Sequence, residues 1–200
     1  MIMSEFTYKA IDLNITKEDI DLITKEIKSI SSGWFWNEYR NCEILSIFDK
    51  DFKWTEEGNT CTHLIKVFKE KIKPIMSSEG KIHILKTKKG SHIPTHIDCQ
   101  QIEIPEFHQK LRLALTGKLD SLYFLDEDGN KVYAPNTYNT YILNGGHPHG
   151  LVPKEEKITV CIGAPWIGED NYSNELFTMN VTPPKLKKEW INARLYKYQK

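Results

Sequence analysis

Arginine is scarce in this sequence. Three of the 27 basic residues are arginines, Arg40, Arg112 and Arg194, and the other 24 are lysines. The 27 acidic residues balance them, so the formal net charge at pH 7 is +0. A neutral chain lacks the excess positive charge that attracts nucleic acids or anionic membranes, and we expect neither as a partner. Where such a chain does use arginine, the planar donor fork of the guanidinium is the expected reason.

Cysteine is also scarce, and the four cysteines lie far apart. Cys42, Cys61, Cys99 and Cys161 form no C-x-x-C pair, which argues against a thioredoxin-like motif or a zinc ribbon and favours a reducing compartment. The first residues lack the cationic segment and apolar core of a secretory signal. No later run approaches the ~18–20 apolar residues of a membrane span. We therefore expect a cytoplasmic protein without a membrane partner.

Length and composition predict one domain over residues 1–200. A chain of 200 residues and 23.3 kDa can bury a full hydrophobic core without splitting into separate units. Its residues are 40% hydrophobic and 11% aromatic, and the sequence has neither a low-complexity tract nor an internal repeat. We expect the whole chain to fold.

Two amphipathic helices are predicted within residues 1–80. Thr16 and Asp19 form a capping pattern, after which isoleucines recur at the three- and four-residue steps of one helix face. A second helical pattern covers 62–75, and Pro74 should bend or weaken its last turn. Two helices are too few for a bundle, so we expect residues 1–80 to form a helical cover over a sheet.

Residues 81–166 are predicted to form the β core. Short β-rich runs separated by Gly, Pro and Asn are typical of an antiparallel sandwich or barrel. The runs span 81–87, 112–117, 121–126, 131–134, 137–143 and 157–165. The acidic run D-E-D-G-N at 126–130 lacks the glycine spacing of an EF-hand loop and predicts a hairpin turn. Residues 167–200 should form a C-terminal extension with a packing helix over 183–198.

Histidines concentrate in this β-rich half, where six of the seven lie between positions 83 and 149. His96 and Asp98 are two residues apart, so on an extended strand both side chains point to one face and could hold one ion. Such pairs are common by chance, and two exposed polar residues at a strand end is the simpler explanation. His147 and His149, in N-G-G-H-P-H-G, offer a third ligand. Two imidazoles and one carboxylate with open positions are the ligand set of non-haem Fe(II) oxygenases.

The residues that carry this pattern resemble a known family. Segments 85–98, 141–150 and 157–165, with the strand that begins at Arg112, resemble the double-stranded β-helix core of the 2-oxoglutarate- and Fe(II)-dependent dioxygenases. Within this superfamily they look most like the aspartyl/asparaginyl β-hydroxylase-like branch, which includes hydroxylases of free amino acids. The resemblance covers about 80–165, less than half of the chain. It implies a mainly β fold with flanking helices around a jelly-roll, cupin-like core.

The same resemblance implies a set of metal ligands. His96 and Asp98 take the positions of the first two, and His149 is the preferred third, because a small residue and then a hydrophobic one follow it as in the family. His147 is the alternative third ligand. Pro148, between the two histidines, has a fixed φ and no N–H and would serve to aim His149.

Cosubstrate contacts are also implied by the resemblance. Lys157 and Thr159 occupy the strand on which the family usually has an arginine that holds the distal carboxylate of 2-oxoglutarate. Lys157 lies eight residues after His149 (157 − 149) and ten after His147 (157 − 147), and the longer separation is the habitual one. Arg112 would contact 2-oxoglutarate or a substrate carboxylate, and a surface ion pair at a strand edge is the alternative.

The implied activity is hydroxylation of an aliphatic carbon in an amino-acid-like substrate, free or peptidyl and Asp/Asn- or Pro-like. Fe(II) and 2-oxoglutarate would be the cofactors, with ascorbate as an accessory reductant, and succinate and CO2 would be released. Two other hypotheses stay open: a non-catalytic jelly-roll binding protein, and a cupin-like metalloenzyme with zinc or manganese that does not use 2-oxoglutarate. The aromatic segment 34–41 either faces the substrate or packs a helix onto the sheet.

Overall fold

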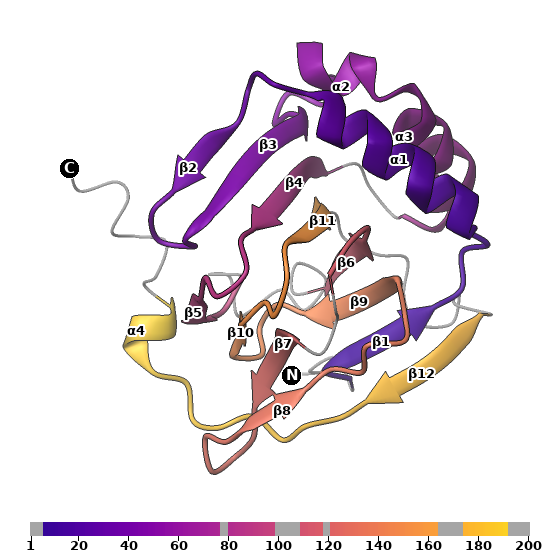
Figure 1. The fold of residues 1–200 in the computed structure, drawn as a ribbon. Coiled ribbons are helices and arrows are strands. Elements are labelled where there is room, and N and C mark those ends of the chain that lie inside the picture. Colours follow the sequence, from indigo (N-terminus) through magenta and orange to yellow (C-terminus); the bar gives the residue numbers. More distant parts are fainter. Residues whose placement is uncertain (1–5, 77–79, 99–108, 118–120, 164–173, 192–200) are drawn as a thin grey trace.

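The computed structural model describes residues 6–76, 80–98, 109–117, 121–163 and 174–191, which form two antiparallel sheets with the helices of the N-terminal part on one side (Figure 1). The larger sheet has the order β12-β1-β9-β6-β11-β4-β3-β2, and the smaller has the order β5-β10-β7-β8. The strands are β1 (Tyr8–Ile11), β2 (Phe35–Asn37), β3 (Cys42–Phe48), β4 (Lys81–Thr87), β5 (Ile93–His96), β6 (Gln109–Ala114), β7 (Leu122–Leu125), β8 (Lys131–Tyr133), β9 (Thr140–Asn144), β10 (His149–Leu151), β11 (Lys157–Gly163) and β12 (Glu175–Met179). This architecture confirms the predicted mainly β fold with flanking helices.

The two sheets share an apolar cluster. Tyr8, Ala114 and Tyr141 come from three strands of the larger sheet, and all are buried together with Leu122 and Phe124 of β7 in the smaller sheet. The six β-rich runs read from the sequence each overlap a strand: β4, β6, β7, β8, β9 and β11. Burial in the clusters on the two faces of the larger sheet explains most of these short apolar runs.

The helices cover another face of the larger sheet. They are α1 (Lys17–Ser29), α2 (Glu56–Thr60) and α3 (Thr62–Val67), followed by the π-helical turn η1 (Phe68–Ile72) and the 3-10 turn η2 (Lys73–Ile75). Ile23 and Ile27 of α1 and Leu64 of α3 belong to the same buried cluster as Ile84 and Val160 of the sheet. Figure 1 shows α1, α2 and α3 grouped on one side of the strands. Both predicted helices are confirmed, and Pro74 lies in the tighter final turn.

Residues 1–80 are more than a helical cover, and this expectation was wrong in part. Strand β1 lies between β12 and β9, and β3 and β2 extend the larger sheet beyond β4. All four residues of β1 are buried, and five of the seven in β3 are buried. A strand covered on both faces loses the alternation of polar and apolar residues, so its sequence carries no period from which to predict it.

The C-terminal extension also differs from its prediction. It contributes strand β12 to the larger sheet, and helix α4 (Lys188–Ile191) begins later than position 183. Pro184 disfavours helical backbone at Pro183, which is why the helix does not begin there. The predicted packing role is confirmed, because Trp190 and Leu186 contact the cluster of Tyr123 and Leu125. Residues 192–200 lie outside the described residues.

The acidic run 126–130 forms the predicted hairpin turn between β7 and β8. The Asp126 carboxylate accepts hydrogen bonds from the backbone N–H groups of Asn130 at 2.8 Å and Asp128 at 3.1 Å. Gly129 has a φ of 84°, a left-handed conformation that glycine adopts without strain. The carboxylate of Asp126 thus stabilises a turn.

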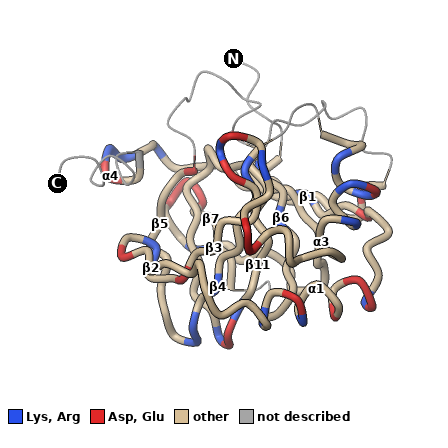
Figure 2. The backbone as a smooth tube through the Cα atoms, turned by 90° about the horizontal axis from the view of Figure 1, so that it is seen from above, with Lys and Arg blue, Asp and Glu red and all other residues tan. Residues whose placement is uncertain are grey.

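Figure 2 shows Lys and Arg positions interspersed with Asp and Glu positions along the described backbone. Among the described helices, none has the length and apolar character of a transmembrane segment.

The Asp19 side chain connects α1 to α3 and η1. We predict that Asp19→Ala lowers the free energy of unfolding by about 2 kcal/mol at pH 7, because the substitution removes both a helix cap and a partly buried ion pair. Its carboxylate accepts hydrogen bonds from Lys71 Nζ at 2.7 Å, His63 Nε2 at 2.9 Å and the Thr16 backbone N–H at 2.9 Å. The Lys71 hydrogen bond, above all, lowers the pKa of Asp19 in the folded state.

A depressed pKa stabilises the fold at pH values above the unfolded pKa of about 3.9, and this stability is lost as the pH falls towards the folded pKa. Urea unfolding at pH 7 and pH 3 should therefore show a smaller effect of Asp19→Ala at pH 3. Asp21→Ala, which removes an exposed partner of Lys17 on the same helix, is the matched control with little effect at either pH. Equal losses for Asp19→Ala at both pH values would contradict this assignment.

Candidate metal centre

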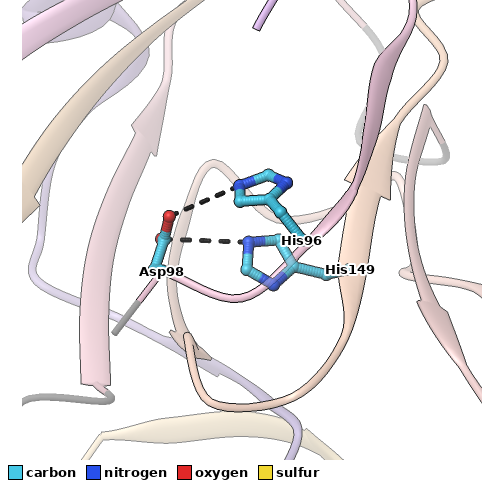
Figure 3. A group of neighbouring side chains, drawn as sticks. All are labelled: His96, Asp98 and His149. Atoms are coloured by element: carbon cyan, nitrogen blue, oxygen red, sulfur yellow. Dashed lines mark ion pairs between the residues drawn. The ribbon is translucent and has the colours of Figure 1, made fainter. Parts of the chain in front are cut away.

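Three potential metal ligands meet in the smaller sheet. His96 ends β5, Asp98 follows two residues later, and His149 begins β10, which pairs with β5 so that His149 lies opposite His96. One ligand atom from each of the three residues lies within 4.8 Å of the other two. Figure 3 shows both imidazole rings directed at the Asp98 carboxylate. The strand pairing thus brings together residues that are more than 50 positions apart, as the sequence pattern predicts.

Backbone carbonyls orient both imidazole rings. His96 Nδ1 lies 2.8 Å from the carbonyl oxygen of Pro94, and His149 Nδ1 lies 2.8 Å from that of His147. A carbonyl oxygen can only accept a hydrogen bond, so each Nδ1 carries the ring proton. Each Nε2 is then unprotonated, and its lone pair is available. The two Nε2 atoms lie 3.4 Å and 3.8 Å from the oxygens of Asp98. This is the tautomer in which a histidine binds a metal ion through Nε2.

The protonation states of Asp98 and His149 also suit a cation. Burial, with a smaller effect of the nearby His96, lowers the pKa of His149 to about 3, so its ring is neutral at pH 7. Burial alone would raise the pKa of Asp98, but the adjacent His96 ring and the charges of Arg40 and Arg112 contribute to holding it well below its usual range. A neutral imidazole and an ionised carboxylate are the forms that bind metal.

The structure distinguishes the two histidines of N-G-G-H-P-H-G. His147 Nε2 lies 2.9 Å from the carbonyl oxygen of Leu125, and its Nδ1 lies 3.4 Å from the hydroxyl of Thr7. Its ring packs edge-on against Phe124. Among the described residues, the group that could hold a metal contains His149 and not His147.

Arg112 is buried rather than exposed at the surface. It lies in the middle of the larger sheet, opposite Cys161 of β11 and Tyr141 of β9. Its Nη1 donates to the carbonyl oxygen of Leu111 at 3.0 Å, and its Nη2 donates to Asp98 Oδ2 at 3.0 Å. The alternative of a surface ion pair at a strand edge is therefore wrong.

Arg40 is a second arginine on the same carboxylate, and the sequence pattern missed this contact. Its Nη2 donates to Asp98 Oδ1 at 3.1 Å. It belongs to the turn between β2 and β3, where its backbone N–H donates to Asn37 Oδ1 at 3.0 Å. Two sequence signals could have singled it out: the scarcity of arginine, and its place in the aromatic segment 34–41.

A cavity next to the three ligands contains the other predicted site residues. Lys157 and Thr159 line it from alternate positions of β11, so both side chains leave the same face of the strand. Arg40 and Arg112 line it too. Lys157 is 2% exposed, which places its ammonium group among buried atoms. The remaining lining residues are Leu85, Thr87, Ile93, His96, Asp98, Leu122, Tyr141, Leu143, His149, Gly150, Leu151 and Cys161.

The aromatic segment 34–41 divides between the helix-side cluster and the metal group. Trp34 packs against the helix-side cluster, and its Nε1 donates to the carbonyl oxygen of Ile30 at 3.0 Å. Tyr39 instead faces the metal group, with its ring edge-on to His96 and the ring centres 6.3 Å apart. Cys99 and His108 lie outside the described residues.

No family model matches the sequence, and no curated protein matches it in sequence. The fold does have solved relatives. A prolyl-4-hydroxylase from Pseudomonas putida superposes with a TM-score of 0.53 and 12% identity, over 82% of this chain and 94% of that chain. A prolyl hydroxylase of Trichoplax adhaerens, solved with a peptide fragment of hypoxia inducible factor, gives 0.53 and 11%, over 80% and 83%. The protein OsALKBH1 gives 0.50 and 9%, over 80% and 97%.

The chain has the fold of the 2-oxoglutarate- and Fe(II)-dependent oxygenases. At such low sequence identities, these superpositions establish a similar fold and not a shared substrate. The predicted double-stranded β-helix core is confirmed, whereas the likeness to the aspartyl/asparaginyl branch stays a prediction. In this oxygenase fold the donor set itself fits a divalent iron, because it combines two imidazole nitrogens with one carboxylate.

Gly150 allows the strands of this oxygenase core to approach each other, and we predict that Gly150→Ala damages the site. A Cβ atom there would lie 2.4 Å from the Tyr123 hydroxyl and 2.8 Å from the Ile93 carbonyl oxygen. Overpacking of this kind costs about 1–3 kcal/mol and should push β10, with His149, away from β5. Thermal unfolding and Co(II) titration measure the two effects. Gly163→Ala is the control, since a Cβ atom there meets nothing within 4 Å, and an unaffected Gly150→Ala would contradict the prediction.

Proposed function

We propose that this protein is a 2-oxoglutarate- and Fe(II)-dependent dioxygenase that hydroxylates an aliphatic carbon of an amino-acid-like substrate. The observation that carries the proposal is the buried group of His96, Asp98 and His149 beside a cavity that contains Lys157, within an oxygenase fold. The alternatives read from the sequence explain this combination less well. A binding module has no need for two imidazoles and a carboxylate within 4.8 Å, and a metalloenzyme without 2-oxoglutarate has no need for a buried lysine.

In this proposal His96, Asp98 and His149 hold Fe(II) through two Nε2 atoms and one carboxylate oxygen, and leave its other positions open. Bound iron supplies the oxidative chemistry: one oxygen atom of O2 enters a substrate C–H bond, and the other enters the succinate that forms from 2-oxoglutarate with loss of CO2. The protein contributes a fixed geometry. The hydrogen bonds from the two Nδ1–H groups to backbone carbonyls keep both rings in place.

Lys157 and Thr159 are proposed to hold the distal carboxylate of 2-oxoglutarate. An ammonium group and a hydroxyl on one face of β11 can each donate a hydrogen bond to a carboxylate, and a buried cation strengthens such bonds. Leu85 and Leu122 line the same cavity and suit the methylene groups of the cosubstrate. The proposed contact of Arg112 with a carboxylate fits its place in the cavity wall.

The substrate is proposed to be a free or peptidyl amino acid, of Asp/Asn or Pro type. Support for a peptide comes from the Trichoplax adhaerens relative, which was solved with a peptide fragment. Support for a small molecule comes from the cavity lining, most of whose residues are buried. A cytoplasmic location remains part of the proposal, as the sequence predicted.

Succinate formation tests the function. The wild-type chain, His96→Ala and Asp98→Ala are incubated with 2-oxoglutarate, Fe(II) and ascorbate, and succinate is measured. We expect slow turnover for the wild type even without its substrate, and none for the two variants. Equal background in all three proteins would refute the proposal, and metal-dependent activity without 2-oxoglutarate would favour the cupin-like alternative.

A further inference from the structure

Backbone pairing constrains His96 only weakly. Its strand β5 has four residues and forms one edge of the smaller sheet. Among the described strands β5 pairs only with β10, at Ile93 and His96, and the register is irregular between these two pairs. Pro94, in the middle of the strand, has no N–H group to donate to a neighbouring strand. The position of this metal ligand therefore depends on contacts other than the backbone hydrogen bonds of the sheet.

Tyr123 joins β5 to the rest of the smaller sheet. It lies on β7, on the far side of β10 from β5, and pairs with Gly150 of β10. Its side chain passes over Gly150, where an added Cβ atom would lie too close to the phenol and to the Ile93 carbonyl oxygen. Past Gly150 the hydroxyl lies 3.0 Å from Thr95 Oγ1 and 3.3 Å from His92 Nε2, both within hydrogen-bond reach. One side chain thus connects three strands.

Packing fixes the Tyr123 phenol in this position. The residue is 1% exposed and belongs to a buried cluster with Leu125 and Trp190. A phenol donates one hydrogen bond and accepts another, so its contacts with Thr95 and His92 can form together. Neighbouring residues on a strand point to opposite faces, so Thr95 faces away from the ligand that follows it. The link therefore acts through the strand and not through the ligand side chain.

We propose that Tyr123 is a positioning residue of the metal centre, which holds His96 and His149 at the separation that one ion requires. Its hydroxyl contacts Thr95, the residue before His96. Its ring lies on Gly150, the residue after His149. Both contacts exist before an ion arrives, so metal binding does not have to supply the free energy that orders β5. This inference rests on the metal centre of the proposed function, and it is independent of the cosubstrate and the substrate.

Co(II) titration of the full chain, followed by visible absorption, tests the inference with Tyr123→Phe. Phenylalanine keeps the ring over Gly150 and removes only the hydroxyl. We expect Co(II) affinity to fall about three- to ten-fold, as the loss of one hydrogen bond implies, and the absorption bands of bound Co(II) to shift. Tyr133→Phe is the matched control and should change neither, because Tyr133 is 46% exposed and its ring packs edge-on to Tyr123 with centres 6.0 Å apart.

Thr95→Val separates the proposed link from a general loss of stability. Valine has nearly the shape of threonine and removes the other end of the hydrogen bond. If the Tyr123 hydroxyl acts through Thr95, each single variant should lower Co(II) affinity, and the double variant should lose less than the product of the two fold-changes. Independent effects in the double variant would overturn the inference. Unchanged Co(II) affinity in Tyr123→Phe would also overturn it, whatever the change in thermal stability.

Hydrogen exchange of the metal-free chain distinguishes failure of this inference from failure of the proposed function. The backbone amides of β5 should exchange faster in Tyr123→Phe than in the wild type, whereas those of β4 and β11 should not. If the wild type binds no Co(II), the proposed function fails, and the exchange rates still decide whether Tyr123 orders β5. Faster exchange supports that role, and equal exchange overturns it. If Tyr123→Phe does not fold, Thr95→Val carries both comparisons, and an unchanged Thr95→Val overturns the inference.

Discussion

Replacing His149 with alanine is expected to abolish metal binding and 2-oxoglutarate turnover, whereas His147→Gln should retain both. His149 directs Nε2 at the Asp98 carboxylate from the first residue of β10, and its Nδ1 is held by a backbone carbonyl. His147 uses Nε2 to contact the carbonyl oxygen of Leu125. Removing a residue that hydrogen-bonds to a metal ligand already lowers metal affinity ~10–100-fold. Removing the ligand itself should therefore lower the affinity more than ~100-fold.

Co(II) titration followed by visible absorption measures the affinity, and succinate formation measures turnover. Glutamine is chosen at position 147 because its amide can still donate to the Leu125 carbonyl oxygen, which keeps a buried acceptor satisfied. Both variants should melt cooperatively. The opposite result, loss of metal in His147→Gln alone, would reassign the third ligand and would favour the spacing of ten residues between His147 and Lys157.

Lys157→Met is expected to raise the KM for 2-oxoglutarate by roughly 10- to 100-fold, which corresponds to the ~1.5–3 kcal/mol of a hydrogen bond to a charged group. Methionine keeps the length and the apolar stem of the side chain in a position that is 2% exposed. Co(II) affinity should stay close to that of the wild type, because Lys157 is not among the metal-binding group. The effect should thus separate cosubstrate binding from metal binding.

Initial rates at varied 2-oxoglutarate measure this effect, with Lys154→Met as an exposed control on the preceding loop. Lys157→Arg should recover part of the affinity, since it restores the charge but needs more space. The backbone of Gly117 limits that space on one side. It packs so closely that a Cβ atom added to Gly117 would lie 2.8 Å from Lys157 Cβ. An unchanged KM in Lys157→Met would show that another cation holds the distal carboxylate.

The sequence predicted the β core and most of the candidate site because both follow local rules. The two-residue period of extended backbone was the reason to pair His96 with Asp98, although β5 ends at His96 and Asp98 lies beyond it. The strands of the core are short apolar runs between turn residues. The positions of Lys157 and Thr159 followed from resemblance. In the structure they line the same cavity as the metal group, although their contact with a cosubstrate stays a prediction.

The parts that escaped prediction depend on contacts distant in sequence. The run 8–11 has four buried residues and no alternation, so only its partners in the sheet identify it as β1. Arg40 lies in a turn 58 residues before Asp98, and no motif links the two. The choice between His147 and His149 likewise depended on where the carbonyl oxygen of Leu125 lies. Pairing and burial of this kind arise from tertiary structure.

The position of β1 has a consequence for the order of folding. Tyr8 pairs with Leu143 of β9 and with Met179 of β12, so this strand waits for partners that are 135 (143 − 8) and 171 (179 − 8) residues further along the chain. At ~5–20 residues per second, a ribosome needs on the order of ten seconds or more to make the second partner. Pairing over such separations is also slow for entropic reasons. All strands of the smaller sheet are therefore synthesised before β12. We expect the edge of the larger sheet formed by β1 and β12 to pair last.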